Sequence, residues 1–180
     1  MDEEVAAMNR RTAIVILALL TGPLSALAAP PEVAGVIKSD KPYSQGRLRV
    51  LFITAYDATL WTDAPGWSWD APFALTFNYH IGFDTDDIVS RSITEMKHVD
   101  PGLSDADVAR LTPQLNKAFP PVRSGEHYTA LYAPGQPIRV WLNGRETGGL
   151  DAAFARDFFG MWLSPNTSQP ALRTALLKLK

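Results

Sequence analysis

Few side chains of this protein could carry chemistry, and two arginines stand out among them. Arg47 and Arg49 alternate in a run of strand-forming residues, so a β-strand would project both from one face together with Leu51, Ile53 and Ala55. An unpaired arginine in an apolar slot costs on the order of several kcal/mol, and such a residue is therefore retained mainly for an anionic partner. The two arginines are candidates for contact with an anion; the alternative is that both face solvent at the end of the strand.

The remaining polar residues exclude several kinds of chemistry. The chain has no cysteine, so it has no thiolate metal site, cysteine nucleophile or disulfide. His80, His98 and His127 lack the spacing of metal ligands, and we expect no metal. Phosphate-binding glycine loops and the G-x-S-x-G and H-E-x-x-H motifs are missing from the sequence. Asp86-Asp87 is interpreted as a helix start rather than a pair of catalytic carboxylates.

The first residues have the pattern of a secretory signal. Arg10-Arg11 supplies the positive charge, Thr12 to Leu20 the apolar run, and Ala26-Leu27-Ala28 the small-residue cleavage site. We predict a signal peptide over residues 1–28, with the acidic residues 1–7 as a mis-called start. The apolar run is too short to span a bilayer, so we expect no stable membrane anchor after cleavage and a periplasmic or secreted protein.

Composition points to one exported domain with a near-neutral surface. The formal net charge is −2 and no basic cluster is present, which argues against nucleic acid as a partner. Residues 29–45, rich in proline and small side chains, are expected to form an exposed, extended lead-in. Residues 46–180 are long enough for a single domain with its own core.

The order of predicted elements indicates an α+β fold. One long strand is expected over residues 46–61 and a second over 73–81, whose Phe73, Leu75 and Phe77 share a face. A helix follows Asp84, with Met96 on its inner side. The next expected element is a helix capped by Ser104 and Asp107 and kinked or split at Pro113. Strands are then expected over 127–132 and 137–142, the second followed by a tight Asn143-Gly144 hairpin turn. The last expected elements are a helix opened by Asp151 and a helix over 171–179. Hairpins instead of βαβ units imply a mostly antiparallel sheet with helices on one face.

Four sequence blocks in this order resemble bacterial chalcone-isomerase-like proteins. They are G-R-L-R-V-L…Y-D-A-x-L-W, L-T-F-N-Y-H-I followed by S-x-x-E-M, F-P-x-V-R-x-G, and the terminal D-x-x-F-A-R-D-F-F-G-M-W-L-S-P-N-T-S-x-P-x-L-R-x-x-L-L. Together they cover about residues 46 to 178. The resemblance implies the open-faced β-sandwich of that superfamily, which includes chalcone isomerases and fatty-acid-binding proteins.

The resemblance implies a site in which one arginine meets an anion at the end of an apolar slot. The candidate ligand contacts are Arg47 and Arg49, with Leu51, Ile53, Phe77 and Met96 as the wall. The plant isomerases also use a tyrosine and an asparagine on a helix, where this chain has only Ser90, Ser92 and Thr94. We therefore expect a non-catalytic protein without a cofactor that binds a small lipophilic anion such as a fatty acid.

Three alternatives to that interpretation stay open at this point. The first is a chalcone-isomerase-type intramolecular lyase. The second is a structural or interaction module of the cell envelope without a ligand, in which a patch around Trp67 and Trp69 engages a protein partner. The third follows from haem-binding proteins with this type of domain, and would make His80 an axial ligand. Tyr56 is expected to be a buried packing residue, with Asp57 bonded to a neighbouring turn.

Overall fold

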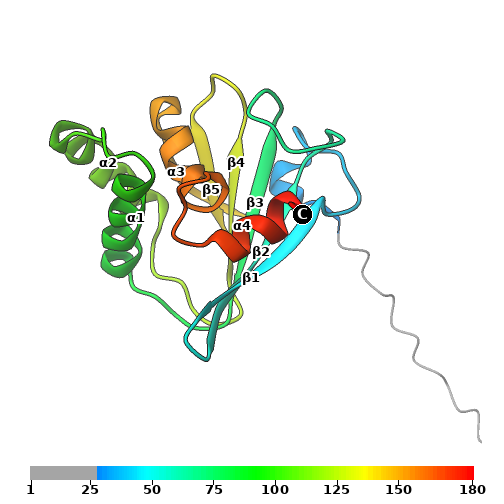
Figure 1. The fold of residues 1–180 in the computed structure, drawn as a ribbon, viewed down its shortest axis with the longest axis horizontal. Coiled ribbons are helices and arrows are strands. Elements are labelled where there is room, and N and C mark those ends of the chain that lie inside the picture. Colours follow the sequence, from blue (N-terminus) through cyan, green and yellow to red (C-terminus); the bar gives the residue numbers. More distant parts are fainter. Residues whose placement is uncertain (1–27) are drawn as a thin grey trace, which may run out of the picture.

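Six antiparallel strands pair in the order in which they follow one another along the chain (Figure 1). The structure is a computed structural model and describes residues 28–180, so the signal peptide predicted for residues 1–28 lies almost wholly outside it. The strands are β1 (Ser44–Val50), β2 (Ile53–Trp61), β3 (Phe73–Tyr79), β4 (His127–Tyr132), β5 (Ile138–Leu142) and β6 (Arg145–Leu150).

Four α-helices cover one face of this sheet. They are α1 (Thr85–Val99), α2 (Asp105–Ala118), α3 (Ala155–Leu163) and α4 (Pro170–Leu177), with short 3-10 helices at Pro31–Val33 and Ala152–Phe154. Alternate strand residues such as Leu60, Leu75 and Val140 join helix residues such as Met96 and Phe158 in one buried core. The predicted α+β class, with a mostly antiparallel sheet and helices on one face, is confirmed.

Local signals position most of these elements as the sequence predicts. Asp84 precedes α1, and its Val89 and Met96 are buried. Ser104 and Asp107 form the predicted reciprocal capping box of α2. That helix continues from Asp105 to Ala118 through Pro113, so of the two expectations, a kink or a split, the split is wrong. Within residues 28–180, none of the helices has the length and apolar character needed to cross a bilayer.

The single long strand predicted over residues 46–61 is wrong, because the chain reverses in its middle. β1 and β2 form a hairpin whose two-residue turn is Leu51-Phe52, with Val50 paired to Ile53. Leu51 has a φ of 56°, and a bulge lies between Leu48 and Arg49. The run Val50 to Ile53 contains none of the glycine, proline, asparagine or aspartate residues that mark turns, which is why its pattern favours a continuous strand.

The lead-in packs on the outer face of the sheet instead of extending into solvent. Val33 and Ile37 are each 1% exposed and lie against Trp61 and Trp141. Asp63 holds this segment in place by accepting hydrogen bonds from the backbone of residues 38 and 39. The lead-in covers only one end of the outer face, and the end near the β1–β2 turn stays open.

The β5–β6 hairpin has the predicted turn, with positive φ at Asn143 (50°) and Gly144 (78°). β6 then continues through Gly148-Gly149 to Leu150. Both glycines are required by close packing: a Cβ on Gly148 would lie 3.2 Å from the Ala118 backbone, and one on Gly149 would lie 2.0 Å from the Ile138 carbonyl oxygen.

The Gly149→Ala substitution should therefore destabilise the protein. The new methyl group would force β6 away from β5, and we expect the free energy of unfolding to fall by about 3 kcal/mol, or folding to fail. Gly66→Ala is the matched control, because no atom lies within 4 Å of a Cβ placed there. Urea denaturation of the two variants measures the difference, and equal midpoints would contradict the packing described here.

Candidate functional site

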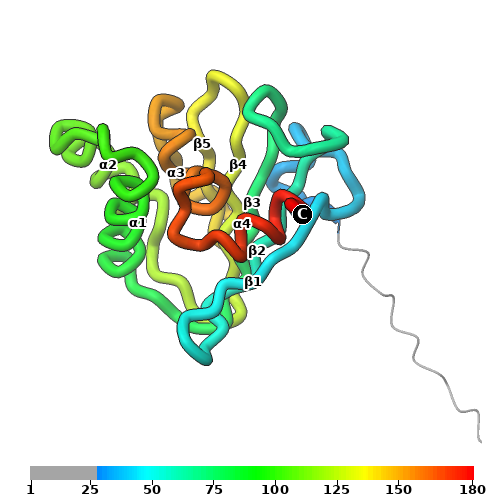
Figure 2. Tube along the Cα trace, viewed as in Figure 1, coloured from blue at the N-terminus to red at the C-terminus, as the bar shows by residue number. Residues whose placement is uncertain are grey.

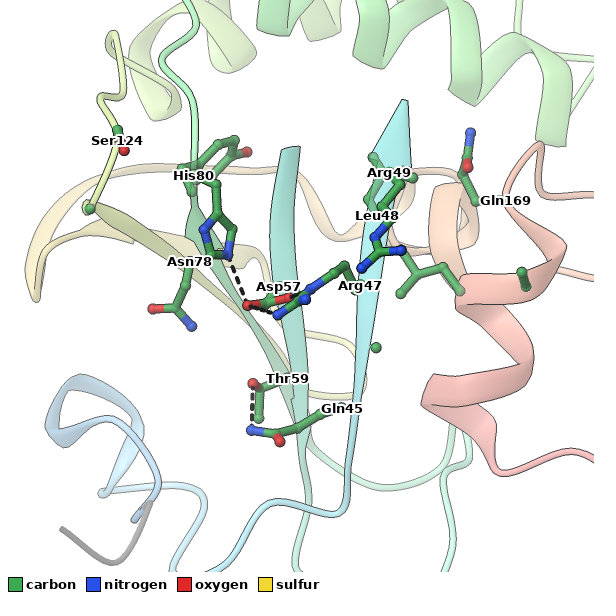
Figure 3. A pocket seen from close by; sticks show the side chains of 15 residues that line it. Gln45, Arg47, Leu48, Arg49, Asp57, Thr59, Asn78, His80, Ser124 and Gln169 are labelled. Atoms are coloured by element: carbon green, nitrogen blue, oxygen red, sulfur yellow. Dashed lines mark hydrogen bonds and ion pairs between the residues drawn. The ribbon is translucent and has the colours of Figure 1, made fainter. Parts of the chain in front are cut away.

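A depression of about 980 Å³ lies at the open end of the outer face and continues around the edge of β1 to the start of α4 (Figure 3). Strands β1, β2 and β3 form its floor. The polar side chains along it are Gln45, Arg47, Arg49, Asp57, Thr59, Asn78, His80, Ser124 and Gln169, and the apolar ones are Leu48, Ala171 and Leu172.

The floor of this depression carries a three-residue charged cluster centred on Asp57. Arg47 and Asp57 are opposite one another in the β1–β2 register, and Arg47 donates from Nε and Nη2 to the two carboxylate oxygens, at 2.5 and 3.1 Å. His80 follows β3, and its Nε2 lies 2.8 Å from Asp57 Oδ2. Figure 3 shows the carboxylate between the guanidinium and the imidazole.

Hydrogen bonding dominates the electrostatics of this cluster. The bond from Arg47 lowers the pKa of Asp57, and His80 acts in the same direction, while partial burial opposes them. The same bond to Asp57 raises the pKa of Arg47. Arg47 is thus held as a compensated cation, because its forked donor already faces a carboxylate.

Arg49 differs from Arg47 in having no ion-pair partner among residues 28–180. It lies beyond the bulge, at the edge of the sheet, beside Leu48 and the beginning of α4. α4 comes very close to β1 three residues earlier, at Gly46, where a Cβ would lie 2.5 Å from the Leu172 side chain. The lining of the depression thus includes an arginine without an ion pair and the aliphatic side chains of Leu48 and Leu172.

The structure brings together only two of the six residues predicted to contact a ligand. Arg47 and Arg49 both line the depression. Leu51 and Ile53 lie at the hairpin turn, where they are 88% and 57% exposed. Phe77 and Met96 are buried in the core on the helix side. The structure therefore does not bring these four residues together as a wall, because the hairpin turn and the thickness of the sheet separate them.

Aromatic side chains fill the space between the sheet and the helices near Phe77. The Phe77 ring lies 4.6 Å from that of Trp162 and 5.2 Å from that of Tyr56. The Tyr56 hydroxyl accepts a 2.8 Å hydrogen bond from Trp162 Nε1, and burial raises the pKa of Tyr56. Tyr56 is a buried packing residue as predicted, whereas Asp57 bonds to Arg47 and His80 rather than to a turn.

The structure also places the two tryptophans and the histidine that the sequence singled out. Trp67 and Trp69 pack edge-to-face with each other and against Phe73, so they belong to a packed flap. His80 lies in the charged cluster on the outer face of the sheet. In the part of the chain that the structure describes, no group of three His, Asp or Glu side chains is arranged to hold a metal ion.

Comparison with known proteins gives the fold a precedent. No protein family model matches the sequence, and no curated protein matches it significantly. Among solved structures, a fatty-acid binding protein from Arabidopsis thaliana superposes with a TM-score of 0.58 at 11% identity, covering 76% of this chain and 86% of that one. This protein has the chalcone-isomerase-like fold. At this identity the likeness establishes the fold alone.

The pairing of Arg47 with Asp57 and His80 was not predicted from the sequence. Arg47 and Asp57 face each other only when the turn is placed at Leu51-Phe52, and a continuous strand puts them far apart. One sequence signal could have indicated the cluster. Asn78 and His80 alternate along and just beyond β3, so both project from the outer face, where Asn78 is paired with Asp57 of β2.

The charged cluster predicts how stability depends on acid. Because the pKa of Asp57 is lowered from its ordinary 3.8, the cluster stabilises the fold above that pH and ceases to do so as the pH falls further. Asp57→Asn should therefore be less stable than the wild type at neutral pH, and the difference should shrink below about pH 4. Thermal unfolding measured from pH 2 to 7 tests this, and a constant difference across the range would contradict it.

Proposed function

We propose that this protein binds a small lipophilic anion, most simply a fatty acid, in the depression at the edge of β1. The carboxylate is held by Arg49, and the alkyl chain lies along Leu48 and Leu172. The observation that carries this proposal is the guanidinium of Arg49, which is exposed, forms no ion pair within residues 28–180 and lines the same depression as Leu48 and Leu172.

Arg49 is a better carboxylate contact than Arg47 for an energetic reason. A ligand at Arg47 would have to compete with Asp57, which already accepts two hydrogen bonds from that guanidinium. At Arg49 the ligand displaces only water, and the bidentate geometry of guanidinium and carboxylate is still available. Arg47 contributes to the site through the shape of the floor more than through its charge.

The fold and the sequence support a lipid-related role. The structural neighbour from Arabidopsis thaliana is described as a fatty-acid binding protein, which makes the same ligand class a reasonable choice for this chain. The signal-like pattern before Ala28 supports export, so the protein is proposed to act outside the cytoplasm. Binding of this kind requires one charged contact and an apolar surface, and no catalytic group.

The test compares two arginine variants in the binding of a fluorescent fatty acid below its critical micelle concentration. Arg49→Gln should weaken binding by about tenfold, because a charge-assisted hydrogen bond is lost. Arg47→Gln, on the same strand, is the matched control and should change the affinity much less. Circular dichroism of both variants shows whether the fold is intact.

Two results would contradict this assignment. Equal affinity of wild type and Arg49→Gln would mean that the carboxylate is not at Arg49. A large loss in Arg47→Gln with none in Arg49→Gln would move the contact onto the floor of the depression. Competition with a long-chain alcohol of the same length then separates recognition of the carboxylate from burial of the chain, since the alcohol has no charge to pair.

A further inference from the structure

Four consecutive apolar residues are exposed at the turn between β1 and β2, and we call them the apolar tip: Val50, Leu51, Phe52 and Ile53. Their exposed fractions are 57%, 88%, 100% and 57%. The turn extends beyond the rest of the described chain at the bottom of Figure 2. Val50 and Ile53 are directly opposed in the register and share one face of the hairpin, while Leu51 and Phe52 form the turn beyond them.

The tip also breaks the local rule for a turn of this kind. Leu51 adopts a φ of 56° at the first position of a two-residue loop, where glycine or asparagine is strongly preferred. The same protein follows the rule at its other tight hairpin, where Asn143 and Gly144 form the turn. Large apolar side chains therefore occupy the β1–β2 turn at a cost to local stability, and positions of this type are commonly functional.

We infer that the apolar tip inserts into the surface of a phospholipid bilayer. At about 3.3 Å per strand residue, the tip reaches roughly 7 Å beyond Arg49, and interfacial protein segments bury their apolar side chains about 5–10 Å deep. With the tip at that depth, Arg49 lies level with the lipid phosphates. Its guanidinium, unpaired within residues 28–180, complements their charge.

The shape of the tip favours lipid over a protein partner. A stable protein interface buries about 1,200–2,000 Å² in total, which four side chains on a narrow hairpin cannot supply. A projecting turn with four exposed apolar side chains needs surroundings that enclose it, and lipid chains do this without a preformed groove. In a tip-to-tip contact, a second copy of this chain would present the same convex surface.

The decisive variant replaces the tip residues by ordinary turn residues. Leu51→Asn/Phe52→Gly installs the sequence found at the β5–β6 turn, so the fold should be as stable as the wild type or more so. Co-sedimentation with vesicles should show a partition coefficient at least about tenfold lower than that of the wild type. Val36→Asn is the matched control, because Val36 is an exposed apolar residue outside the tip, 39% exposed.

Vesicles of phosphatidylcholine alone and of equal parts phosphatidylcholine and phosphatidylglycerol separate apolar insertion from attraction to charge. The comparison is made in the full chain and in residues 29–180, because the apolar run Thr12 to Leu20 would add its own affinity to every full-length variant. Since the chain has no cysteine, Phe52→Cys can also carry a polarity-sensitive dye at a single site. Its emission should shift to the blue with vesicles, and that of labelled Val36→Cys should not.

Three outcomes would overturn the inference. They are no binding of wild-type residues 29–180 to either vesicle, equal binding by the wild type and the turn-replacement variant, and a concentration-dependent dimer that the same variant abolishes. Fatty-acid binding is measured without vesicles and through Arg49→Gln, so the failure of either proposal leaves the other standing.

Discussion

The register of β1 on β2 determines which side chains line the depression and form the apolar tip. With the turn at Leu51-Phe52, Arg47 lies opposite Asp57 and Leu48 opposite Tyr56, so charge is sorted to the outer face and apolar surface to the helix side. In a strand pair a slip of one residue exchanges the faces. Such a slip would direct Arg47 into the aromatic core and Leu48 to the outer face, and the bidentate contact between Arg47 and Asp57 opposes it.

The two faces of the sheet offer a ligand very different opportunities. On the helix side, the rings of Tyr56, Phe77 and Trp162 fill the interior, and a bond between two of them satisfies their polar atoms. On the outer side, Val33 and Ile37 cover one end, while the other end stays open with its charged cluster. A ligand can reach the outer end and the edge of β1 without displacing any packed side chain.

Patterns with a local cause could be predicted from the sequence, and features set by distant contacts could not. The Asn143-Gly144 turn and the Ser104–Asp107 capping box follow from the chemistry of adjacent residues, and both are present. The Leu51-Phe52 turn has no such signal, because its residues are all strand formers. Gly148 and Gly149 are likewise explained only by distant contacts, because they let α2 and β5 approach β6 closely. The missed turn also affected the predicted site. Leu51 and Ile53 were assigned to its wall because the strand was taken as unbroken.

The apolar tip and the edge of the depression belong to one hairpin, so the two proposed contacts, with a bilayer and with a fatty acid, would lie side by side. Arg49 is separated from the tip by no intervening residue, and it also lines the depression. If the tip lies in a bilayer surface, the edge of β1 faces the lipid phosphates, and a fatty acid leaving the bilayer would pass its carboxylate directly to Arg49. Its alkyl chain would then exchange lipid contacts for Leu48 and Leu172 without crossing water as a separated molecule. A soluble protein that collects its ligand from water has no need of such a tip, so the cost of placing Leu51 at positive φ is explained best when both proposals hold.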